Sequence, residues 1–176
     1  LGTHPDAPEI FVPALKEGEE SDEAKAREGY DSGLDVAAVW VAHAGGDRFV
    51  WRVDMVGEPH LDDTVLHLYI DGDMDRDTGR KSQGNVGGVE YMITSVGGVG
   101  RSTVFDADGN HLAPLLVTVE AVERSVFFSA DVALGKGPDG ARFELYVLCH
   151  SRTSADRPRP TMSDSSRRVL VDGVTL

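Results

Sequence analysis

The stretch that decides the fold is LHLYIDGDMDRDTGRKSQGNVGGVEYMI, residues 66–93. It begins in an apolar run, 65–70, that is rich in β-branched and aromatic side chains. Four aspartates then follow at every second position: Asp71, Asp73, Asp75 and Asp77. After a glycine-rich segment, a second apolar run covers 89–93. Short apolar runs bounded by Asp and Gly are typical of strands. The stretch therefore predicts a strand, a loop and a returning strand.

The closely spaced carboxylates of this loop predict a cation site. Carboxylates so near one another repel unless a cation lies among them or the backbone turns them into water. Oxygen ligands two residues apart on a flexible loop suit calcium, which accepts six to eight oxygens with loose geometry. A further carboxylate on the returning strand can face the loop. The predicted metal ligands are Asp71, Asp73, Asp75, Asp77 and Glu90. The alternative is a solvated acidic turn without an ion.

The spacing of these aspartates only partly matches an EF-hand loop. Asp71, Asp73 and Asp75 occupy positions 1, 3 and 5 of such a loop. Position 6, where a glycine makes the sharp turn, holds Arg76, and position 12, where a bidentate glutamate belongs, holds Ser82. The flanking runs also have the composition of strands. We therefore expect the site between two strands and not between two helices.

Composition limits the class of protein. The chain has 176 residues, 40% hydrophobic residues and 20 glycines, which fits one turn-rich domain with a proper core. Its net charge of −13 argues against nucleic acid and anionic membrane surfaces as partners, since both need a basic face. No apolar run approaches the roughly 20 residues of a membrane span, so no membrane insertion is expected. Cys149 is the only cysteine, and its apolar neighbours predict a buried side chain and not a nucleophile.

The rest of the sequence predicts an all-β domain. Alternating side chains give a β-hairpin over 34–56, with Trp51 on the core face. Short strands separated by Gly, Pro, Asp and Asn turns continue to the end of the chain. About eight to ten strands are expected, in an antiparallel, jelly-roll-like β-sandwich over 34–176. Residues 1–33 are expected to form an N-terminal extension, with an extended segment and one short helix over 17–29.

With the strands placed, one motif resembles a known family. The segment YIDGDMDRDTG, followed by a glycine-rich loop and GVEYMI, is similar to the pattern of DOMON-like sandwiches related to the family 9 carbohydrate-binding modules. Ser163-Asp164, before the apolar run 168–171, occupies the place of an extended loop in those proteins. The resemblance covers most of the chain, from about residue 34 onward. It implies a calcium-stabilised sandwich with Asp71, Asp73, Asp75 and Glu90 near the ion, and a carbohydrate face that bears aromatic rings.

The sequence departs from this family pattern in three respects. It has Glu90 where an aspartate is usual, it has the extra aspartates Asp75 and Asp77, and it contains only two tryptophans. Because Trp51 is assigned to the core, the rings expected to stack on a sugar are Trp40, Tyr69 and Tyr91. The alternative for each of these rings is an ordinary place in the core.

The sequence favours a binding module over an enzyme. It lacks G-x-S-x-G, H-E-x-x-H and a glycine-rich phosphate loop between a strand and a helix. A glycosidase built from Glu90 and an aspartate needs only two carboxylates, but nothing in the spacing selects it. We therefore expect a non-catalytic calcium-binding accessory domain whose ligand is a polysaccharide or oligosaccharide. The alternatives are a structural or protein-interaction module without a sugar site, and a carbohydrate-active enzyme.

The expected location follows from the metal. Extracellular calcium modules work at millimolar concentrations of the ion, so an extracellular or cell-surface location is expected. The chain begins with Leu1-Gly2 and not with methionine, which is expected of a domain excised from a longer protein or of a processed product. Neighbouring domains are expected on that ground.

Overall fold

A computed structural model of the chain describes residues 12–16, 31–80, 87–137, 140–153, 163–165 and 169–174. The described residues form twelve β-strands and one 3-10 turn, η1 (Leu61–Asp63), without an α-helix. Every strand pairing is antiparallel. The expected all-β class is therefore confirmed. No helix within these ranges has the length and apolar character of a membrane span.

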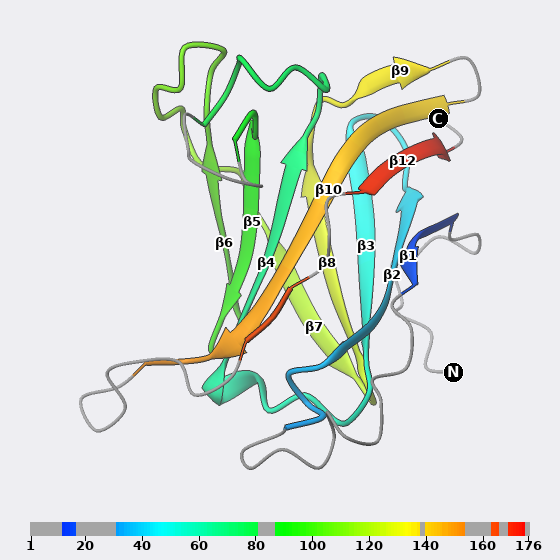
Figure 1. Ribbon diagram of the computed structural model, residues 1–176, viewed down its shortest axis with the longest axis vertical. Coiled ribbons are helices and arrows are strands. Elements are labelled where there is room, and N and C mark those ends of the chain that lie inside the picture. Colours follow the sequence, from blue (N-terminus) through cyan, green and yellow to red (C-terminus); the bar gives the residue numbers. More distant parts are fainter. Residues whose placement is uncertain are drawn as a thin grey trace.

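One sheet, sheet A, contains five strands in the order β1-β2-β3-β8-β7 (Figure 1). Its members are β1 (Val12–Lys16), β2 (Val36–His43), β3 (Arg48–Met55), β7 (Thr118–Val122) and β8 (Ser125–Asp131). Strands β2 and β3 form the hairpin expected over 34–56. Strand β1 lies in the expected N-terminal extension and pairs with β2, so this part of the extension belongs to sheet A. The helix expected over 17–29 lies outside the described residues.

The second sheet, sheet B, contains seven strands. Its members are β4 (Thr64–Asp71), β5 (Tyr91–Val96), β6 (Val99–Val104), β9 (Gly135–Gly137), β10 (Gly140–Ser151), β11 (Ser163–Ser165) and β12 (Val169–Val174). The main order is β11-β10-β4-β5-β6, and β9 and β12 also pair with β10. The described strands outnumber the eight to ten expected because β1, β9 and β11 have only three to five residues. Strands that short show no alternation in a sequence.

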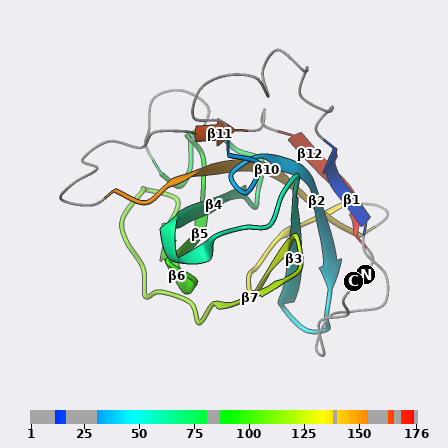
Figure 2. The same ribbon diagram turned by 90° about the horizontal axis from the view of Figure 1, so that it is seen from below.

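The buried side chains of the two sheets form one hydrophobic core. Leu66, Leu68 and Ile70 of β4 have no exposed surface, and the same holds for Trp51 of β3 and Phe128 of β8. Trp51 thus lies in the core, as its alternation predicts. Figure 2 looks along the strands and shows the two sheets curving around this interior. The arrangement is sandwich-like, while a jelly-roll winding stays a prediction.

Strand order fixes where the acidic loop lies. In the pairing of β4 with β5, Ile70 stands opposite Tyr91. The chain therefore leaves β4 and enters β5 at the same end of the two strands. Residues 71–90 therefore begin and end at neighbouring points. Cys149 lies on β10 with its side chain fully buried, as expected. The edge strands of the two sheets also meet, β12 against β1 and β6 against β7.

Candidate metal centre and aromatic face

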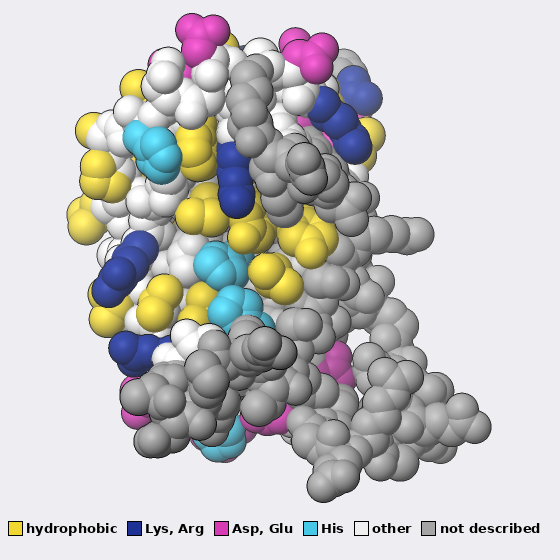
Figure 3. All heavy atoms as spheres, turned by 60° about the vertical axis from the view of Figure 1, so that its left-hand side comes forward, with side chains coloured by type: hydrophobic (Ala, Val, Ile, Leu, Met, Phe, Trp, Pro, Cys, Tyr) yellow, Lys and Arg dark blue, Asp and Glu magenta, His cyan; other side chains and the backbone are white. Residues whose placement is uncertain are grey.

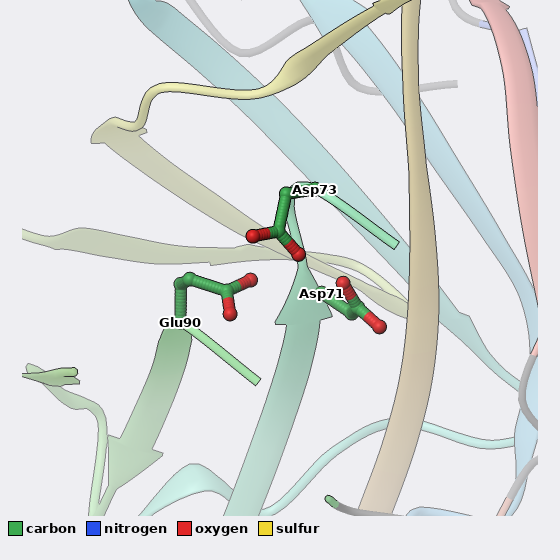
Figure 4. A group of neighbouring side chains, drawn as sticks. All are labelled: Asp71, Asp73 and Glu90. Atoms are coloured by element: carbon green, nitrogen blue, oxygen red, sulfur yellow. The ribbon is translucent and has the colours of Figure 1, made fainter. Parts of the chain in front are cut away.

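Three carboxylates meet where β4 ends and β5 begins. Asp71 is the last residue of β4, Asp73 follows two residues later, and Glu90 directly precedes β5. One oxygen from each carboxylate lies within 4.8 Å of the other two. Figure 4 shows Glu90 extending from the start of β5 toward the two aspartates at the end of β4. Oxygens that share one calcium ion at 2.3–2.6 Å lie no more than about 5 Å apart, so the spacing of this acidic triad fits calcium.

Burial and mutual repulsion make the acidic triad an unfavourable place for negative charge. Asp71 is only 1% exposed, while Glu90 is half-buried and Asp73 is exposed. Burial raises the pKa of the Glu90 carboxyl, and the negative charge of Asp73 raises it further. Hydrogen bonds from Gly72 and Thr78 act against this rise in pKa. A cation among the three carboxylates would favour their charged forms.

Hydrogen bonds within the loop hold the triad in place. Asp73 Oδ1 accepts a hydrogen bond from the backbone N–H of Asp75 at 2.9 Å, and Asp75 Oδ1 accepts one from Asp77 N–H at 2.9 Å. These are turns in which an aspartate binds the backbone two residues on. The hydroxyl of Thr78 lies 3.1 Å from Asp73 Oδ2 and 3.2 Å from Glu90 Oε1. The Thr78 hydroxyl thus lies between two members of the triad.

Asp75 and Asp77, both predicted as metal ligands, lie outside the acidic triad, and both are exposed. Met74 has a φ of 61°, so the backbone turns after Asp73 and no longer continues as an extended strand. The aspartates alternate in the sequence as far as Asp77, but their side chains keep the alternating directions of an extended strand only as far as Asp73. Of the five predicted ligands, the structure brings Asp71, Asp73 and Glu90 together.

Glycine lets the loop approach the returning chain closely. Gly79 has a φ of +61°, and a Cβ atom there would lie 2.5 Å from Glu90 Oε1 and 2.6 Å from the carbonyl oxygen of Val89. Beside it, the N–H of Arg80 donates to the carbonyl of Val89 at 2.9 Å, and Gly88 N–H donates to the carbonyl of Arg80 at 3.1 Å. A residue other than glycine at position 79 would therefore displace Glu90 or open the loop.

The three rings predicted to stack on a sugar do not form one site. Trp40 lies on the outer face of sheet A, where the guanidinium of Arg52 is 4.8 Å from its ring centroid. Tyr91 packs against the core, and its hydroxyl is 3.2 Å from the backbone of Ala133. Tyr69 lies on the outer face of sheet B and is 8% exposed. The predicted trio is thus distributed over three parts of the molecule.

Tyr69 belongs instead to a row of four rings on the outer face of sheet B. The ring centroids are 5.6 Å apart for Tyr146 and Tyr69, 5.5 Å for Tyr69 and His67, and 5.5 Å for His67 and His150. Tyr146, His67 and His150 are half-buried, so this ring row presents part of its surface to solvent. Figure 3 looks onto this face and shows histidine side chains (cyan) among hydrophobic ones (yellow). The sequence contains one signal for the row, the shared parity of His67 and Tyr69.

His67 is neutral in the middle of the ring row. Burial above all, together with the electrostatic effect of the neighbouring His150 and Arg80, lowers the pKa of His67 to about 4. Its Nδ1 lies 3.0 Å from the hydroxyl of Thr94. The guanidinium of Arg80 lies 5.8 Å from the centroid of the Tyr69 ring. The row therefore combines rings, a neutral imidazole and one nearby cation.

Comparisons with protein-family models, with curated proteins and with solved structures find no match to this chain. The resemblance to DOMON-like sandwiches stays a prediction from the motif in 66–93 and the order of elements. Function is accordingly inferred from the acidic triad and the ring row.

Gly79→Ala should destabilise the protein more than Gly46→Ala. The two glycines share a φ of +61°, but a Cβ on Gly46 would meet nothing within 4 Å, whereas one on Gly79 would collide with Glu90 and Val89. Both variants bear the same backbone strain, so the difference isolates the steric conflict, which should cost about 1–3 kcal/mol. Urea unfolding measures both. Equal losses of unfolding free energy would show that the loop is not packed against Glu90.

Protonation of His67 should destabilise the fold. Its folded-state pKa of about 4 lies below the ordinary value of 6.5, so the native state binds this proton less readily than the unfolded chain. This contribution to stability is complete above the ordinary value and is lost as pH falls from 6.5 toward 4. Over that range the wild type should lose more unfolding free energy than His67→Gln. An NMR titration midpoint near the ordinary histidine value would contradict the assignment.

Proposed function

We propose that this chain is a non-catalytic β-sandwich module that binds calcium at Asp71, Asp73 and Glu90. The observation that supports the proposal is the convergence of these three carboxylates, within 4.8 Å, where the loop leaves β4 and rejoins the sheet at β5. An all-oxygen set of carboxylates suits calcium, whereas zinc and copper sites prefer imidazole and thiolate. Magnesium demands a stricter octahedral geometry, which two aspartates and a glutamate on a loop and two strand ends do not favour.

The proposed ion would act as a staple between β4 and β5. Asp71 ends one strand and Glu90 precedes the other, so one ion bound to both would join the two strand ends across the loop. Its charge would oppose the burial and the repulsion from Asp73 that raise the pKa of Glu90. Three carboxylates leave some of the six to eight calcium positions to water or backbone oxygens.

The ligand that we propose for this module is a polysaccharide or oligosaccharide bound on the ring row. The apolar face of a sugar can stack on the half-buried ring of Tyr146, and the imidazoles of His67 and His150 offer nitrogen atoms to its hydroxyls. Trp40 is less suited because Arg52 covers its ring, and Tyr91 is held between the core and Ala133. Of the rings expected from the sequence, Tyr69 is the one that belongs to the row.

The family and the location are part of the same proposal. The strand, acidic loop and returning strand, together with a core shared by two antiparallel sheets, support assignment to the DOMON-like sandwiches. A calcium site of a few carboxylates on a surface loop fits the millimolar calcium outside cells. We therefore propose an extracellular or cell-surface accessory domain.

Calcium should raise the melting temperature of the protein. An ion that binds only the folded state stabilises it by mass action, by about 2.7 kcal/mol at a free concentration of one hundred times Kd. Asp71→Asn and Glu90→Gln should abolish the increase. Asp75→Asn and Asp77→Asn remove the same charge from the same loop outside the triad, and they should retain it. Differential scanning calorimetry in EDTA and in excess calcium measures the shift. An unchanged melting curve of the wild type would exclude the site.

A sugar ligand should make the protein bind polysaccharide through the ring row. In affinity electrophoresis, the wild type should be retarded by at least one immobilised polysaccharide, and Tyr146→Ala should lose most of that retardation. Trp40→Ala, a ring substitution on the outer face of sheet A, should behave as the wild type. Retardation by no polysaccharide would instead favour a structural or protein-interaction module.

A further inference from the structure

Three arginines lie on or beside the face that carries the ring row, although the whole chain has a net charge of −13. The nearest carboxylates on β4 and β10 are Asp71, two residues after Tyr69, and Glu144, two residues before Tyr146 and paired with Arg76. Arg80 lies over the ring of Tyr69, and its Nη1 is 3.9 Å from the sulfur of Met92. Arg101 of β6 stands opposite Thr94 in the pairing of β5 with β6, and it is exposed. The hydroxyl of Thr94 contacts His67, so Arg101 shares the outer face of sheet B with the row.

A third arginine lies at the end of this face. Arg152 directly follows β10 and is exposed, and its guanidinium lies beside Gly97 in the turn between β5 and β6. Arg80 and Arg101 thus lie on the outer face of sheet B, and Arg152 lies after the end of β10, beside the turn between β5 and β6. Figure 3 shows Lys and Arg side chains (dark blue) around the histidines and hydrophobic side chains, with Asp and Glu (magenta) toward the rim.

These three arginines differ from others in their partners. Four described arginines form ion pairs with carboxylates: Arg48 with Asp131, Arg52 with Asp54, Arg76 with Glu144 and Arg142 with Asp172. Within the part of the chain that the structure describes, Arg80, Arg101 and Arg152 form no such pair. These three arginines are therefore positive charges without a carboxylate partner there, on a molecule that is otherwise acidic.

We propose that the ring row together with Arg80, Arg101 and Arg152 binds an acidic polysaccharide, one whose sugars carry carboxylate or sulfate groups. This inference rests on the proposed sugar-binding function and names the class of sugar. A guanidinium binds either anion through two parallel hydrogen bonds, and its charge persists at every physiological pH. The stacking of Arg80 on Tyr69 holds that guanidinium at the surface of the row before a ligand arrives.

The remainder of the molecule favours this site over others for an anionic chain. The net charge of −13 repels a polyanion from most of the surface, so binding is restricted to the face where the arginines gather. At neutral pH the imidazole of His67 is uncharged, and it can exchange hydrogen bonds with a hydroxyl group. The rings supply stacking, and the arginines supply selectivity for acidic sugars over neutral ones.

Affinity electrophoresis with three polymers tests the inference in the presence of calcium. Hyaluronan carries carboxylates, dextran sulfate carries sulfates, and hydroxyethyl cellulose is neutral. The wild type should bind at least one acidic polymer more tightly than the neutral one, and the affinity should fall as the NaCl concentration rises. The two acidic polymers distinguish carboxylate from sulfate as the preferred group.

Arginine variants locate the binding on this face. Arg80→Gln and Arg101→Gln should each weaken binding of the acidic polymer by roughly 10-fold, since each removes charge-assisted hydrogen bonds. Arg48→Gln removes the same charge from sheet A, where Arg48 pairs with Asp131, and should bind as the wild type. An unchanged circular dichroism spectrum and melting temperature in each variant establish that the fold is intact.

The outcomes separate this inference from the function on which it rests. Binding of the neutral polymer alone, or equal binding by the wild type and the Arg80 and Arg101 variants, overturns the acidic ligand and leaves a sugar-binding module. Binding of no polymer overturns both. A single-stranded DNA oligonucleotide that binds as tightly as the acidic polymer would show a general anion surface, and that result also overturns the inference.

Discussion

The antiparallel pairing of β4 with β5 is the constraint on which the candidate site depends. Because Ile70 stands opposite Tyr91, the residues next to them, Asp71 and Glu90, are neighbours whatever the loop between them does. Asp73, two residues after Asp71, must then turn back toward Glu90. The hydroxyl of Thr78 contacts both Asp73 and Glu90 and holds Asp73 in that position. Backbone hydrogen bonds of the sheet thus preorganise two of the three carboxylates. This would lower the conformational entropy cost of ordering the ligands when an ion binds.

Local patterns in the sequence were sufficient for part of this arrangement. The alternation around Leu68 identified the buried face of β4, and a hairpin-like return placed Glu90 toward the loop. The same pattern predicted Asp75 and Asp77 as ligands, yet they lie outside the triad. The reason is the positive φ of Met74, a conformation that ordinary residues rarely adopt and that composition does not reveal. Alternation in a sequence predicts alternation in space only while the backbone stays extended.

The ring row could not be predicted because it depends on which strands are neighbours. His67 and Tyr69 come from β4, while Tyr146 and His150 come from β10, far along the chain. Period-two patterns indicate which side of its own strand a ring occupies, but they contain no information about the adjacent strand. The face on which Trp40 lies is also hard to predict, because strict alternation would place it on the same side of the strand as Val36. The register shift early in β2 lets Val39 and Val41 face the core, so Trp40 is directed outward.

The acidic triad and the ring row are physically joined through two segments. Along β4, Tyr69 of the row lies two residues before Asp71 of the triad. Across the loop, the backbone N–H of Arg80 donates a hydrogen bond to the carbonyl of Val89, the residue before Glu90. The guanidinium of Arg80 lies over the ring of Tyr69. An ion that orders the loop would therefore also restrict Arg80 at the surface of the row. Such a shared element makes coupling reciprocal, so a ligand that fixes Arg80 would also favour the ion-bound loop. In this arrangement the proposed calcium site would lie beside the ring row, at the end of β4, and would act on the ligand face through the loop that carries Arg80.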